Sequence, residues 1–136
     1  MIVIDASLTA AWLLAEKNFS ATTDLLDLLS RDSLLAPPHW LTEVGNAIRK
    51  AVRTHRILSE DVRSIVAVLT SLDVAIVPPL RMSEVTDLVH FALEHGLSVY
   101  DAAYVRLAAA RQVPLATLDD AMKTAARKIG VAVVPV

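Results

Sequence analysis

The sequence predicts an α/β fold, a three-layer α/β/α sandwich in which helices cover both faces of a central, mainly parallel sheet of about five strands. Five short apolar or β-branched runs recur along the 136-residue chain. Longer segments with helical periodicity separate these runs, and no internal repeat or linker interrupts them. Such alternation is typical of a parallel sheet with right-handed crossovers. A chain of this length is expected to build one hydrophobic core, so residues 1–136 are predicted to form a single domain.

The expected strands are short, and the first has no alternation of apolar and polar residues. Its residues Ile2, Val3 and Ile4 are all apolar, as in a strand that is buried on both faces. The proline pairs at 37–38 and 78–79 end two further strands because proline cannot donate to a sheet ladder. The expected strands are Ile2–Ile4, Ser33–Ala36, Val74–Val77, Pro114–Thr117 and Val131–Val134.

The segments between the strands carry apolar residues three and four positions apart, which predicts helices. Gly96 and Gly130 follow two of these segments, where glycine commonly ends a helix. The expected helices are Leu8–Ala15, Ala21–Ser30, Trp40–Thr54, Ser59–Ser71, Ser83–His95, Asp101–Arg111 and Asp119–Ile129.

The composition excludes several classes of protein. The chain is 54% hydrophobic and 21% charged, unlike a disordered chain, and no apolar run approaches the roughly 20 residues of a membrane helix. A strand that begins at residue 2 leaves no room for a signal peptide. The absence of cysteine excludes disulfides and thiolate metal sites. We therefore expect a cytoplasmic protein that does not enter membranes.

Four acidic residues are expected near one edge of the sheet. Asp5 ends the first strand, Glu43 lies in the first turn of the helix after the second strand, and Asp119 follows the fourth strand by two residues. Ligands bind at the carboxyl ends of the strands in such sheets. Asp101 opens a helix that follows another helix, so the topology is consistent with the same edge without requiring it.

Each acid also has a simple structural explanation, because a carboxylate in the first helical turn accepts backbone N–H groups. Four acids in apolar surroundings such as MIVID and VPLATLDD would, however, repel one another unless a cation neutralised them. Oxygen ligands fit Mg²⁺ or Mn²⁺. The polar residues Ser7, Asn46 and Thr117 lie two or three positions from these acids, where they either orient them or serve as ordinary helix polarity.

The segments IVIDAS, TEVGNAI, SVYDAAYVRLA and LATLDD resemble the four acidic motifs of PIN-domain ribonucleases, in particular the VapC toxins of toxin–antitoxin pairs. The resemblance extends from residue 2 to the C-terminal strand. It implies a PIN-like fold and a Mg²⁺- or Mn²⁺-dependent endoribonuclease that cleaves RNA. It also implies a homodimer, inhibition by a small VapB-like antitoxin, and in some members a larger toxin–antitoxin assembly. By position, Asp5, Glu43, Asp101 and Asp119 would be the catalytic, metal-binding acids.

The last motif departs from the usual pattern because two acids, Asp119 and Asp120, are adjacent. The spacing Thr-x-Asp favours Asp119, which would leave Asp120 facing solvent on the following helix.

The basic residues are unevenly distributed although the net charge is -2. A cluster in and after the 40–54 helix is either an ordinary solvated face or a surface for RNA phosphates. Its members are Arg49, Lys50, Arg53 and Arg56.

Aromatic and histidine residues are given mainly structural roles. Trp12, Trp40, Tyr100 and Tyr104 are expected in the core or at interfaces rather than under nucleic-acid bases. Apolar Leu8–Leu14 is expected in the core, with an antitoxin groove or a dimer interface as alternatives. The four histidines form no zinc pattern, and His39 near Glu43 is the one pair to consider as ligands.

Two other classes of function remain open. A flavodoxin-like phosphoacceptor module also places an acid after its first strand, but Asp5 lacks an adjacent acid and no suitable lysine follows a late strand. A catalytically silent binding module would use its acids only as helix caps.

Overall fold

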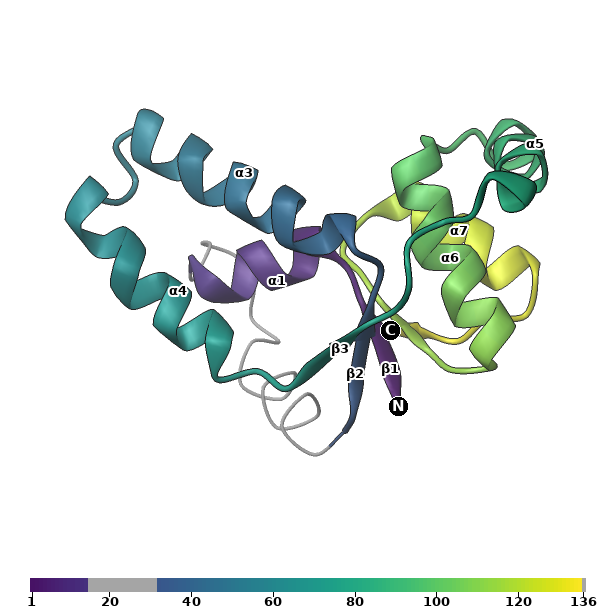
Figure 1. Ribbon diagram of the computed structural model, residues 1–136, viewed down its shortest axis with the longest axis horizontal. Coiled ribbons are helices and arrows are strands. Elements are labelled where there is room, and N and C mark those ends of the chain that lie inside the picture. Colours follow the sequence, from purple (N-terminus) through teal and green to yellow (C-terminus); the bar gives the residue numbers. More distant parts are fainter. Residues whose placement is uncertain (15–31, 136) are drawn as a thin grey trace.

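The computed structural model describes residues 1–14 and 32–135. Its helices cover both sides of a central sheet, so the predicted three-layer sandwich is confirmed (Figure 1). Helices α1 (Ala6–Leu13), α3 (His39–Arg53) and α4 (Val62–Thr70) lie on one side, and α5 (Val85–His95), α6 (Val99–Arg111) and α7 (Asp120–Lys128) lie on the other.

The sheet contains five strands, and every pairing is parallel. The strands are β1 (Ile2–Ile4), β2 (Leu34–Ala36), β3 (Val74–Ile76), β4 (Leu115–Ala116) and β5 (Val133–Val134), in the spatial order β3-β2-β1-β4-β5. Along the chain, β2 and β3 are added on one side of β1, and β4 and β5 are then added on the other side. The order therefore reverses beside β1, and the crevice at the carboxyl ends of β1 and β4 is the expected place for a ligand.

The predicted elements are found with shifted ends. Strands β2 to β5 are one or two residues shorter than predicted. Helix α1 begins at Ala6 because Asp5 caps it, and α6 begins at Val99 because Ser98 caps it. Two short 3₁₀ turns, at Ser59–Asp61 and Met82–Glu84, precede α4 and α5. The helix predicted at Ala21–Ser30 lies outside the described residues.

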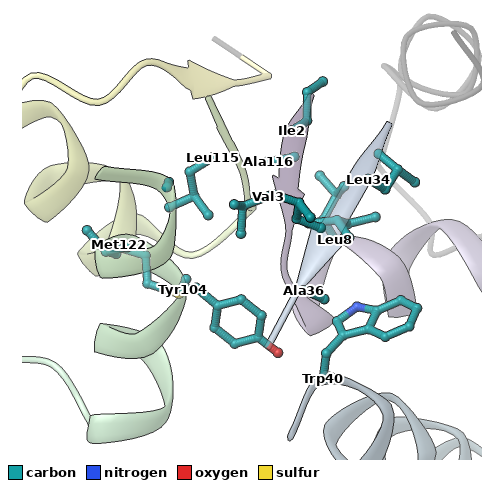
Figure 2. Packing of buried hydrophobic residues seen from close by; sticks show 14 of the residues in the cluster. Ile2, Val3, Leu8, Leu34, Ala36, Trp40, Tyr104, Leu115, Ala116 and Met122 are labelled. Atoms are coloured by element: carbon teal, nitrogen blue, oxygen red, sulfur yellow. The ribbon is translucent and has the colours of Figure 1, made fainter. Parts of the chain in front are cut away.

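The core lies along both faces of β1 and reaches into the helical layers (Figure 2). Val3 and Ile4 are fully buried in the same cluster as Leu8 of α1 and Tyr104 of α6. Trp40 is 2% exposed, which confirms its predicted core position. Trp12, in contrast, remains partly exposed on α1.

A glycine ends one of the helices, as the sequence predicts. Gly96 ends α5 with a φ of 63°, a left-handed conformation that glycine adopts without strain. Within residues 1–14 and 32–135, no helix has the length and apolar character needed to cross a bilayer.

Candidate active site

Carboxylates from four separate elements line one small pocket at the carboxyl edge of the sheet. The pocket has a volume of about 70 Å³. Asp5 follows β1, Glu43 comes from α3 and Asp101 from α6, while Asp119 precedes α7. The lining residues are Asp5, Ala6, Ser7, Glu43, Asp101, Tyr104, Asp119 and Met122. The structure thus brings together the four acids that the sequence singled out.

Asp5 lies at the base of the pocket and is 2% exposed. Its Oδ1 accepts a hydrogen bond from the Leu8 backbone N–H at 2.9 Å, which caps α1. Its Oδ2 accepts from the hydroxyls of Ser7 at 2.7 Å and Thr117 at 2.5 Å. The Asp5 N–H itself donates to the carbonyl of Ala116, which ties the residue to β4. The carboxylate is therefore held in one orientation by donors from both ends of the chain.

Burial raises the pKa of Asp5 from 3.8 to about 6, because the charged form loses its hydration. The hydrogen bonds from Thr117, Leu8 and Ser7 oppose this increase, and the nearby charge of Asp119 adds to it. Placing a carboxylate here thus costs folding energy unless a positive charge compensates for it.

Glu43 does not lie in the first turn of its helix, so that prediction is wrong. Helix α3 starts at His39, one residue earlier than predicted, and its first turn contains no acid. The Glu43 side chain instead accepts a hydrogen bond at Oε1 from the Tyr104 hydroxyl at 2.8 Å. His39 Nε2 lies 3.5 Å from the same oxygen. Capping therefore does not account for Glu43.

Asp101 is the third residue of α6, which Ser98 caps by accepting the Asp101 N–H at 3.1 Å. Its pKa is raised, first by burial and then by the charges of Asp119 and Glu43, although the Ser98 bond and His39 oppose the change. Mutual repulsion among these acids is the electrostatic signature of a site that attracts cations.

Asp119 and its neighbour Asp120 differ in position. Asp119 caps α7 by accepting the Met122 N–H at 2.8 Å, and its own N–H donates to the Thr117 hydroxyl at 3.0 Å. It lines the pocket, whereas Asp120 is exposed on the first turn of α7.

Asn46 and the basic residues lie outside the pocket. Asn46 is exposed on α3, and no hydrogen bond joins it to an acid among the described residues. Arg49, Lys50 and Arg53 are exposed further along the same helix, and Arg56 follows its end.

The donor set fits a hard divalent cation, because the acidic side chains at the pocket offer oxygen ligands. In the described part of the chain, however, no group of three or more acidic or histidine side chains is arranged to hold a metal ion as it stands. The acids are instead engaged by protein donors, as described for Asp5, Glu43 and Asp119. The chemistry of the lining residues therefore fits Mg²⁺ or Mn²⁺, although their present hydrogen bonds do not arrange them as a coordination sphere.

Tyr104 is a site residue that sequence reasoning missed, whereas His39 was considered only as a ligand partner of Glu43. Tyr104 was expected in the core or at an interface, and it is buried in the core at 1% exposure, but its hydroxyl also reaches Glu43. The available signal was spacing: Tyr104 follows Asp101 by three positions and His39 precedes Glu43 by four, so each shares a helical face with an acid.

The fold and the acidic pocket define the class of protein to which the chain belongs. The family model of the PIN domain matches residues 2–128, and the chain belongs to this family. Its sequence is 38% identical over 114 residues to Ribonuclease VapC1 from two strains of Mycobacterium tuberculosis, over 82% of this chain and 81% of the relative. The expected likeness to VapC-type PIN proteins is thereby confirmed.

A solved structure has the same fold. The crystal structure of PAE2754 from Pyrobaculum aerophilum matches with a TM-score of 0.70 and 27% sequence identity, covering 98% of this chain and 83% of that chain.

Proposed function

We propose that this protein is a metal-dependent endoribonuclease, the toxin of a toxin–antitoxin pair, and that residues 1–136 form its single PIN domain. One observation carries the proposal: Asp5, Glu43, Asp101 and Asp119 reach one pocket from four separate elements. Membership in the PIN family and similarity to a ribonuclease support it.

We propose that the four acids hold Mg²⁺ or Mn²⁺. When bound, such an ion would polarise the phosphodiester and lower the pKa of a water that attacks the phosphorus in line. The hydroxyls of Ser7 and Thr117 both donate to Asp5 Oδ2, and these two hydrogen bonds fix the orientation of the carboxylate. A volume of about 70 Å³ accommodates an ion with a few waters.

The test is cleavage of RNA with Mg²⁺ or Mn²⁺ present. We expect Asp5→Asn and Asp101→Asn to reduce the rate by more than about 100-fold, the upper end for residues that merely support a ligand. Asp120→Asn is the matched control, because this exposed acid lies next to the pocket without lining it, and it should retain activity. Cleavage that persists in both pocket variants would refute the proposal.

We propose that RNA leaves the pocket along α3. Glu43, Asn46, Lys50 and Arg53 follow one another at intervals of three and four residues, so they form a stripe on one helical face. Arg49 lies beside this stripe and Arg56 beyond its end. Ten residues of helix span about 15 Å, enough for a few phosphates of a single strand.

A small VapB-like antitoxin is the proposed inhibitor of a homodimeric, cytoplasmic toxin. Leu8 is buried and unavailable, but Trp12, Leu13 and Leu14 at the end of α1 stay partly exposed and offer an apolar contact. A basic antitoxin side chain at the acids would block the ion by charge complementarity. We expect Trp12→Ala to weaken antitoxin binding at least tenfold, measured by calorimetry, with an unchanged Tm of the isolated toxin. Unchanged affinity would exclude this surface.

A catalytically silent binding module is the second candidate, since Asp5 and Asp119 do cap α1 and α7. This candidate predicts that the wild-type protein cleaves no RNA with either ion. It does not explain why Glu43, which caps no helix, lines the acidic pocket.

A further inference from the structure

We propose that Tyr104 is a positioning residue, whose hydroxyl fixes the Glu43 carboxylate at the acidic pocket. The inference rests on the proposed function and deepens it, because Tyr104 would act only through Glu43 and would not touch RNA.

The contact joins two helices on opposite sides of the sheet. The Tyr104 hydroxyl of α6 donates to Glu43 Oε1 of α3 at 2.8 Å. Figure 2 shows the Tyr104 ring reaching from α6 toward the sheet, with its hydroxyl oxygen at the tip. Both residues line the pocket. The bond therefore crosses from one helical layer to the other at the site itself.

The two partners differ in freedom of movement. The Tyr104 ring is 1% exposed and packed in the core, whereas the Glu43 side chain is 35% exposed. An unattached glutamate side chain has many rotamers, and ordering it opposes ligand binding. A hydrogen bond from an immobile ring removes much of this freedom before an ion arrives. It also occupies Oε1 and leaves Oε2 for a ligand.

The tyrosine remains a donor at any physiological pH. A tyrosine hydroxyl ordinarily loses its proton only at about pH 10, and here it donates to Glu43 Oε1 at 2.8 Å. Glu43 is therefore held by a neutral donor, which adds no charge to compete with a cation.

His39 completes the arrangement. Its Nε2 lies 3.1 Å from the Tyr100 carbonyl, which only accepts, so this nitrogen carries the proton. Its ring contacts the rings of Tyr104 and Tyr100 edge-on, with centroid distances of 5.0 and 5.6 Å. The start of α3 is thereby held against α6, which keeps Glu43 within reach of Tyr104.

The decisive variant is Tyr104→Phe, which removes the hydroxyl and retains the ring. Binding of Mn²⁺ alone is measured by its effect on the Tm, without RNA. Because this stabilisation follows RT ln(1 + c/Kd) at a Mn²⁺ concentration c, we expect the Mn²⁺ concentration that gives the same increase in Tm to rise about 10-fold to 100-fold, as for other residues that support a metal ligand. Tyr100→Phe is the matched control, because it removes an exposed hydroxyl on the same helix and keeps the ring and the carbonyl that contact His39. It should bind Mn²⁺ as the wild type does.

A double-variant cycle tests whether the effect passes through Glu43. In a Glu43→Ala background, Tyr104→Phe should cause no additional loss of Mn²⁺ affinity. An equal loss in both backgrounds, or no loss in the wild-type background, would overturn the inference.

A second measurement avoids dependence on the folding of any variant. A crystal structure of the wild-type protein with Mn²⁺ should retain the Tyr104–Glu43 bond, and a broken bond would overturn the inference. If the wild-type protein binds Mn²⁺ and cleaves RNA while Tyr104→Phe matches it, only this inference fails. If the wild-type protein neither binds Mn²⁺ nor cleaves RNA, the proposed function fails as well.

Discussion

At the scale of single residues, Asp5 combines a fixed orientation with an unfavourable charge. Three donors hold its carboxylate, yet burial still raises its pKa to about 6. The native protein thus binds this proton more tightly than the unfolded chain does. The free energy of unfolding consequently decreases as the pH rises from about 4 to about 6, and it changes little from this residue above that range.

The pH dependence can be isolated by comparison with Asp5→Asn in a metal-free buffer. A pKa difference of about two units corresponds to about 3 kcal/mol. We expect the wild type to lose about this much free energy of unfolding relative to the variant between pH 4 and pH 7, as measured by urea unfolding. Asp120→Asn, which changes an exposed acid, should give a curve parallel to that of the wild type. Parallel curves for Asp5→Asn as well would show that Asp5 has an ordinary pKa.

How far the sequence predicts individual contacts depends on the range of the interaction. Thr117 and Asp5 are 112 positions apart, yet their meeting follows from β1 and β4 ending at one edge of a parallel sheet. The Tyr104 hydroxyl could not be assigned to Glu43, because its partner depends on how α6 packs across the sheet edge from α3. The periodicity of the sequence predicts the order of strands and helices, but it does not predict which side chains pair between the two helical layers.

At the scale of elements, a buried chain of hydrogen bonds joins α1 to α3. The Trp40 Nε1 donates to the Thr9 hydroxyl at 3.0 Å, and this hydroxyl donates to the Asp5 carbonyl at 2.6 Å. Thr9 is fully buried and Trp40 nearly so. The two helices that carry Asp5 and Glu43 are therefore joined through polar groups that have no access to water.

We expect Thr9→Val to destabilise the protein by about 1–3 kcal/mol, because it leaves the buried Trp40 N–H without its acceptor. Thr124→Val is a close control: its hydroxyl also donates to the carbonyl four residues earlier, Asp120, but on an exposed face of α7. The control should change the free energy of unfolding by less than about 0.5 kcal/mol. Equal effects of both substitutions, measured by chemical unfolding, would show that the Trp40 bond contributes nothing.

The ends of elements were predicted less well than their positions. The five strand positions are confirmed, because these are short apolar runs and most of them adjoin a proline, which leaves few alternatives. The start of α3 was misplaced by one residue, since Pro38 at its N-cap makes no side-chain hydrogen bond that could identify it. This one-residue difference moved Glu43 out of the first turn and removed its capping role.

At the scale of the whole molecule, the net charge is only -2, but two local groups of charge differ in sign. Four acids line the pocket at the sheet edge, whereas Lys50 and Arg53 lie in the last turn of α3, whose far end extends away from the sheet (Figure 1). Long-range attraction of RNA by the whole protein would be weak, so binding should depend on this local basic stripe.

The salt dependence of RNA binding tests this arrangement. Replacing Lys50 or Arg53 with Gln should lower the slope of log K against log salt by about 0.7 for each lost phosphate contact with a single strand. Arg111→Gln is the control, because this exposed residue ends α6 and lies outside the proposed path along α3. If the control lowers the slope as much as the two α3 variants, RNA does not follow α3. Inactive Asp5→Asn protein allows binding to be measured without cleavage.

The central place of β1 in the sheet also affects when the site can exist during synthesis. Strand β1 is synthesised before its neighbour β4, and the hydroxyl of Thr117 comes 112 residues after Asp5. Until then the nascent polypeptide can form only the β3-β2-β1 part of its sheet, and Asp5 lacks the hydrogen bond from Thr117. A product that ended before β4 would lack both Thr117 and Asp119, so the pocket can assemble only after these two residues have been synthesised.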